Sequence, residues 1–86
     1  MVTREILRLI PVGTVIRVEQ VAIRQLGGGE NVQRHFDNVE DALSSNQNYL
    51  DYKAVCLKQV GGIITVVCQA NQEQELATIR AWYEGR

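Results

Sequence analysis

Few residues of this 86-residue chain are of the types that catalyse reactions or bind metal ions. Its two cysteines, Cys56 and Cys68, and its one histidine, His35, do not have the spacing of a zinc site. The glycine run 27–29 is followed by Glu30 and lacks the lysine of a phosphate-binding loop. The sequence shows neither a carboxylate pair nor a nucleophile beside a base. We therefore predict a protein without catalytic residues, metal ion or cofactor.

Cationic and amide side chains in the first two thirds of the chain suggest DNA binding instead. Lysine and arginine neutralise phosphates, whereas side chains on a helix can reach base edges in a groove. The formal net charge is −1, so any cationic surface must be local. The candidate phosphate contacts are Arg17, Lys53 and Lys58, and the candidate groove contacts are Gln33, Arg34 and Asn38.

A protein partner is the alternative. The segment around residues 30–41 has four carboxylates against Arg34 alone, and carboxylates repel a phosphate backbone. The chain could then be an interaction module or a dimeric adaptor that uses this acidic segment or its C-terminal helix. Trp82 is open to two interpretations, because it could also close the core of a small domain. The candidate partner contacts are Asp37, Asp41, Trp82 and Tyr83.

Composition predicts one small domain over residues 1–86. Hydrophobic residues make up 45% of the chain and charged residues 22%, as in ordinary globular proteins. No apolar run reaches the roughly 20 residues of a membrane span, and the first residues do not resemble a signal peptide. We therefore expect a soluble cytoplasmic protein that does not bind membranes.

The first half of the chain reads as helix, strand, helix, helix. A helix begins at Thr3 and cannot continue through Pro11. The β-branched run 14–18 predicts a strand, and apolar residues between Val18 and Leu26 fit a second helix that the glycines end. Residues 31–46 predict a third helix, which in a winged helix would be the recognition helix.

The second half reads as a β-hairpin and a helix. Gly61-Gly62 suits a type I′ turn within a hairpin over residues 52–70. In that register Leu57 faces Val66, and the two cysteines lie on opposite faces, so they cannot form a disulfide. Asn71 can cap the last helix. The fold class predicted is α+β, a winged helix with an added C-terminal helix, whose core would include Val32, Phe36, Val39, Leu43, Val55, Leu57, Val66 and Ile79.

The pattern resembles the DNA-binding domain of the alkylguanine-DNA alkyltransferases and their alkyltransferase-like relatives. Residues 6–15 are similar to that family's helix end and "IPxGxV" strand, and residues 38–46 are similar to its "AVGRALxxN" segment. From Asn46 the spacing runs without a gap to Gly62, where the family has its wing turn. Residues 75–85 resemble its closing helix. The resemblance implies a winged helix that binds DNA.

The family's functional residues are replaced in this chain. Residues 53–56 stand where the family has Pro-Cys-His-Arg, so Ala54 occupies the position of the alkyl-accepting cysteine. The family's base-flipping arginine corresponds to Asp37 and its strand tyrosine to Val18. The resemblance therefore implies a scaffold without alkyl transfer or base flipping. Some alkyltransferase-like members also lack the acceptor and bind damaged DNA without repairing it.

Overall fold

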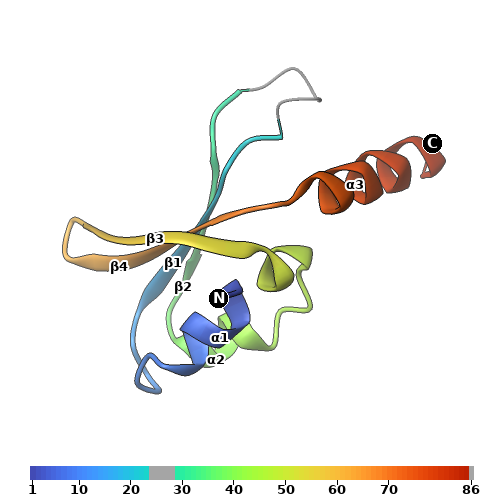
Figure 1. Cartoon of the computed structure of the whole chain (residues 1–86). Helices are drawn as coiled ribbons and strands as arrows, with labels where there is room; N and C mark the ends of the chain where they lie inside the picture. Colours follow the sequence, from blue (N-terminus) through green and yellow to red (C-terminus); the bar gives the residue numbers. More distant parts are fainter. Residues whose placement is uncertain (24–28, 86) are drawn as a thin grey trace.

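The computed structural model describes residues 1–23 and 29–85, which form an α+β fold (Figure 1). None of the helices in these residues has the length and apolar character needed to cross a bilayer. In chain order the elements are α1 (Thr3–Arg8), β1 (Ile16–Gln20), β2 (Val32–Phe36), α2 (Val39–Leu43), the 3-10 helix η2 (Asn48–Asp51), β3 (Lys53–Val60), β4 (Ile63–Gln69) and α3 (Gln72–Glu84).

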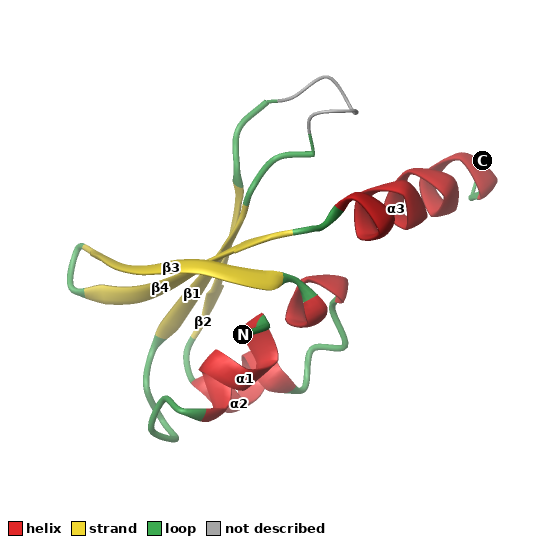
Figure 2. Ribbon diagram, viewed as in Figure 1, coloured by secondary structure: helices red, strands yellow, loops and turns green. Residues whose placement is uncertain are grey.

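The four strands form one mixed sheet in the order β2-β1-β4-β3 (Figure 2). The inner strands β1 and β4 run parallel to each other. The outer strand β2 is antiparallel to β1, and the outer strand β3 is antiparallel to β4. The predicted α+β class is confirmed at this level, whereas a winged-helix topology is not confirmed.

The helix expected at residues 18–26 was wrong over its described residues, and the helix expected at residues 31–46 was correct only for α2. Val18 lies in β1, residues 24–26 lie outside the described residues, and the first part of the expected third helix is β2. β1 and β2 pair from Ile16 opposite Phe36 to Gln20 opposite Val32. The apolar spacing in both segments also suits a helix, but pairing with neighbouring strands outweighs such local preference.

Asn38 explains why the expected third helix is divided. Its side chain accepts a hydrogen bond from the Asp41 amide at 2.9 Å and so caps the N-terminus of α2. A capping residue adopts extended backbone, and Asn38 has φ −150° and ψ 157°. The helix therefore begins only at Val39, after the end of β2.

The β3–β4 hairpin has the predicted turn and most of the predicted register. Gly61 and Gly62 have φ of 60° and 80°, the positive values that a type I′ turn requires. Leu57 lies opposite Val66, as predicted. Between Ala54 and Cys56 the register shifts by a bulge, so that Ala54 and not Val55 pairs with Cys68.

The core lies between one face of the sheet and the helices α1, α2 and η2. Buried side chains from these helices, among them Leu7, Ala42 and Leu50, pack against the strands. Ile16 and Val18 of β1 and Val66 and Cys68 of β4 supply the strand side of the core.

The predicted core was correct only in part. Two of its eight residues are buried and two more pack against the core, namely Val39 and Val66, then Phe36 and Leu43. Val32, Val55 and Leu57 are instead about half exposed, because they lie on the edge strands β2 and β3. Ile79 belongs to α3, which has no buried residue.

The C-terminal helix α3 begins as predicted and then projects from the rest of the molecule (Figure 1). Asn71 accepts a hydrogen bond from the Gln74 amide at 2.8 Å, and the Gln74 side chain accepts one from the Asn71 amide at 2.9 Å. This capping box fixes the start of the helix.

Candidate functional site

The sheet has a second face that points away from α1 and α2, which we call the outer face. Successive side chains of a strand point to opposite faces, and residues in register share a face. Because Ile16, Val18, Val66 and Cys68 point into the core, the alternate strand residues belong to the outer face. These are Gln33 and His35 of β2, Arg17 and Glu19 of β1, Lys53, Cys56 and Lys58 of β3, and Thr65, Val67 and Gln69 of β4.

Cations lie close together in the register of the outer face. Arg17 is opposite Thr65 on one side, and Lys58 is opposite Thr65 on the other. On the far side of Arg17 from Thr65 lies His35, which is 3.4 Å from the Asp37 carboxylate. Lys53 lies on this face towards the other end of β3, opposite Gln69. The three lysine and arginine residues predicted to contact phosphates thus share one face of the sheet, with Lys53 five residues along β3 from Lys58.

A buried carboxylate, that of Glu19, lies at the centre of the outer face. Glu19 is 6% exposed and accepts hydrogen bonds from Gln33 Nε2 at 2.7 Å and Asn31 Nδ2 at 3.2 Å. Lys58 Nζ lies 3.2 Å from the same carboxylate. The Gln33 hydrogen bond lowers the pKa of Glu19, and the contacts of Asn31 and Lys58 act in the same direction, against the effect of burial. Glu19 is therefore ionised, and its carboxylate holds side chains of β2 and β3 against β1.

Two of the predicted DNA contacts lie elsewhere. Arg34 is opposite Val18 in β1, so it lies on the core side of the sheet, where its guanidinium carbon is 5.8 Å from the centre of the Tyr49 ring. Asn38 uses its side chain to cap α2. Gln33 does lie on the outer face, but its amide nitrogen donates to Glu19. The grouping of Gln33, Arg34 and Asn38 on one helix face was wrong, because β2 replaces that helix.

Charge is distributed unevenly between the strands and the rest of the chain. The strands contain four lysine and arginine residues, three of them on the outer face, but one carboxylate, Glu19, which is already paired with Lys58. The other nine acidic residues lie in helices or in the segments between elements. Among the described residues Arg17 and Lys53 have no acidic partner, whereas Arg4 pairs with Asp51 on the helical side. A net charge of −1 is thus compatible with a cationic outer face.

The residues predicted to bind a protein partner fall into two separate groups. Asp37 and Asp41 lie before and within α2, whereas Trp82 and Tyr83 lie near the end of α3, far from α2 (Figure 1). Asp37 is 3.4 Å from His35 Nε2. Trp82 is 47% exposed and therefore does not close the core. These four residues do not form one continuous surface.

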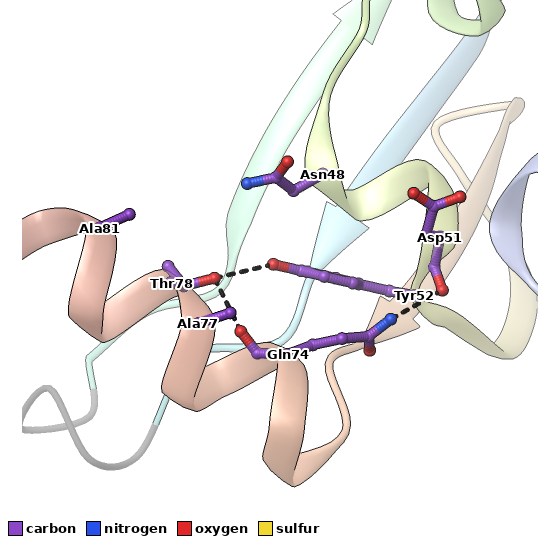
Figure 3. Close-up of a pocket in the computed structure, with 7 residues that line it drawn as sticks. All are labelled: Asn48, Asp51, Tyr52, Gln74, Ala77, Thr78 and Ala81. Carbon is purple, nitrogen blue, oxygen red and sulfur yellow. Dashed lines mark hydrogen bonds between the residues drawn. The ribbon is translucent and has the colours of Figure 1, made fainter.

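An open pocket of about 220 Å³ lies where α3 meets η2 (Figure 3). The Tyr52 hydroxyl is 3.3 Å from Thr78 Oγ1, and Gln74 Nε2 donates to the Asp51 carbonyl at 3.0 Å. Pockets for metabolites usually span about 300–1,000 Å³, so this one suits a single side chain better. It is lined by Asn48, Asp51, Tyr52, Gln74, Ala77, Thr78 and Ala81.

The two cysteines lie apart, as predicted from the hairpin register. Cys56 is exposed on the outer face and Cys68 is buried in the core, and both are free thiols. Burial raises the pKa of Cys68, although its hydrogen bond with Thr3 opposes this effect. In residues 1–23 and 29–85, no three His, Cys, Asp or Glu side chains are grouped as metal ligands.

Comparison of the chain with protein-family models, curated proteins and solved structures gives no match. The resemblance to the alkyltransferase DNA-binding domain therefore stays a prediction. Two features were not predicted from the sequence, namely the contacts of Glu19 with Asn31, Gln33 and Lys58 and the pocket beside α3. The available signal for the Glu19 contacts was a glutamate between the apolar residues Val18 and Val21. Its partners, up to 39 residues away, could not be identified without the strand order.

Proposed function

We propose that the outer face binds the phosphate backbone of duplex DNA, as part of a small non-catalytic regulator or accessory protein. The observation that carries the proposal is the row in which Arg17 and Lys58 flank Thr65, with Lys53 on the same face. The cytoplasmic location predicted from the sequence belongs to this proposal. Because β2 and the short α2 replace the expected recognition helix at residues 31–46, we assign the contacts to the sheet.

Binding through this face would be weak and insensitive to sequence. Arg17 and Lys53 are without an acidic partner among the described residues, whereas Lys58 shares its charge with Glu19. Two to three phosphate contacts fall below those of typical specific DNA-binding proteins, and nonspecific dissociation constants are about 10⁻⁴ to 10⁻⁶ M. We therefore expect phosphate contacts without base readout.

Single-residue variants test this assignment. We expect Arg17→Ala to weaken the binding of a fluorescein-labelled duplex about threefold to tenfold in an anisotropy titration at low salt, because it removes one phosphate contact. Arg8→Ala is the matched control, since Arg8 is an exposed arginine on α1, outside the outer face. It should bind like the unchanged protein.

Two results would contradict the proposal. The first is the absence of binding by the unchanged protein at high micromolar concentration and low salt. The second is an equal loss of affinity in Arg17→Ala and Arg8→Ala, because the contact would then depend on overall charge and not on this face.

A further inference from the structure

The outer strand β3 directs backbone groups away from the sheet along part of its free edge. The Cys68 carbonyl of β4 accepts a hydrogen bond at 2.9 Å from the amide that directly follows β1, so the backbone of Cys68 faces β1. Because this direction alternates along a strand, Val66 and Ile64 face β1 as well. Their partners in β3 are Leu57 and Gln59. The N–H and C=O groups of Leu57 and Gln59 therefore point to the edge.

The chain itself shows that this edge accepts an extended segment. Val2 forms an isolated antiparallel bridge with Lys53, and the Ala54 amide donates to the Met1 carbonyl at 2.9 Å. These contacts end before Leu57, which is 57% exposed. Among the described residues no strand lies beyond β3 in the sheet (Figure 2). A free edge of this kind is a template for an added strand.

A second copy of the chain fits the edge poorly. A twofold axis that pairs Leu57 with Gln59 of the other copy places the two Lys58 side chains opposite each other, where like charges are destabilising. Pairing Leu57 with Leu57 brings Gln59 opposite Val55, which lies in the bulge. Pairing Gln59 with Gln59 brings Leu57 opposite Gly61, in the turn and outside the strand. Lysine on an edge strand commonly prevents such self-pairing.

The charge of the edge favours an acidic partner instead. β3 contains Lys53 and Lys58, and neither β3 nor β4 contains a carboxylate. The Lys58 side chain is 43% exposed, and its ammonium group has three N–H donors, so it can bind a second carboxylate besides that of Glu19. We propose that β3 binds an extended acidic segment of a protein partner, which adds to the sheet as a fifth strand.

The register defines the sequence pattern of the partner segment. An antiparallel strand would exchange hydrogen bonds with Leu57 and Gln59, as the Met1–Val2 segment does with the start of β3. Its residue opposite Lys58 lies on the outer face, where a carboxylate is favoured. Its neighbours lie on the core side, where β-branched apolar side chains would contact Leu57. The partner segment therefore alternates acidic and apolar residues. This proposal does not rest on DNA binding.

A titration with a capped heptapeptide of alternating valine and glutamate tests the proposal, with amide hydrogen exchange measured by NMR. In the free protein we expect Leu57 and Gln59 to exchange faster than Lys58 and Val60, whose amides face β4. Saturating peptide should slow exchange at Leu57 and Gln59 about tenfold or more, because both amides become hydrogen-bonded. A peptide with lysine in place of glutamate should bind about tenfold more weakly.

Variants of Gln59 test the backbone pairing separately from charge. Gln59→Pro removes an N–H that points to the edge, a position where strands tolerate proline, and should weaken peptide binding about threefold to tenfold. Gln59→Ala keeps this N–H and is the matched control. A glutamate peptide methylated at the amides that face β3 should bind the unchanged protein similarly weakly. Because residue 59 lies on the core side of the sheet, DNA binding should be the same in both variants.

Several results would overturn the proposal. The first is the absence of peptide binding at millimolar concentration, and the second is equal binding of the glutamate and lysine peptides. Unchanged exchange at Leu57 and Gln59 in saturating peptide would overturn it too, as would full binding of the methylated peptide. Slower exchange at these two amides with rising protein concentration alone would assign the edge to a second copy of the chain and contradict an acidic partner.

Discussion

Glu19 connects three strands through one carboxylate. It lies on β1, while its partners Gln33 and Lys58 come from β2 and β3, and Asn31 directly precedes β2. Asn31 also accepts the backbone amide hydrogen of Ala22 through its side-chain oxygen, at 3.1 Å. A buried carboxylate with this many donors is stabilising in its ionised form, and its replacement leaves donors without an acceptor.

We predict that Glu19→Gln lowers the free energy of unfolding by about 1–3 kcal/mol at neutral pH. The new amide group presents a donor where the Gln33 and Asn31 amides already donate. Urea unfolding measures the change, with the exposed Glu84→Gln on α3 as the matched control. A loss no larger in Glu19→Gln than in Glu84→Gln would contradict the anchoring role of Glu19.

The same variant gives a pH test. Because the pKa of Glu19 is lower in the folded protein than the ordinary glutamate value of 4.5, the unfolded chain binds more protons between the two values. The stabilisation from Glu19 is thus present above about pH 4.5 and is lost as the pH falls through the folded pKa. We expect the stability difference between the unchanged protein and Glu19→Gln to shrink as the pH is lowered from about 7 to about 3. A constant difference over this range would contradict the assignment.

At the scale of elements, local signals predicted α1 and the second half of the chain, and they failed between β1 and α2. Gly61-Gly62 and Asn71 specify a turn and a helix start by themselves, because positive φ and capping depend on neighbouring residues. Val18 and Val32 lack such a signal. They became strand residues because β1 pairs with both β2 and β4, and β4 is more than 40 residues away in the sequence.

The predicted site residues also divide into those that the structure keeps on one face and those that it separates. Arg17, Lys53 and Lys58 were chosen for their charge, which no change of secondary structure alters, and the strand register brings them to one face. Arg34 and Asn38 were chosen for their place on an expected helix. When that segment formed β2 and a cap, they separated from the group.

Variants of Asn38 distinguish a role in capping α2 from a role in contacting DNA. We predict that Asn38→Ala lowers the free energy of unfolding by about 1 kcal/mol, because α2 loses its cap and carries the core residues Val39 and Ala42. Asn38→Asp retains the capping acceptor and is the control in urea unfolding. DNA affinity should change little in Asn38→Ala at a temperature where it is folded. A clear loss of affinity there would mean that Asn38 contacts DNA, in conflict with its place as a cap.

At the scale of the whole molecule, the strands and the other segments differ in charge, and one helix projects. The molecule measures 37 Å along its longest axis and 23 Å along the other two, and α3 projects from the rest (Figure 1). The strands carry the excess of cations, whereas most carboxylates lie on the helices or between elements.

The salt dependence of DNA binding tests the central claim most directly, because it reports how many phosphates the outer face neutralises. We predict a log-log slope of about −2 to −3 for the unchanged protein, falling in magnitude by about 2 in the double variant with Arg17→Ala and Lys53→Ala. The double variant with Arg8→Ala and Arg80→Ala removes the same charge from α1 and α3 and should keep the original slope. An unchanged slope in the first double variant, or an equal reduction in both, would contradict DNA binding through the outer face.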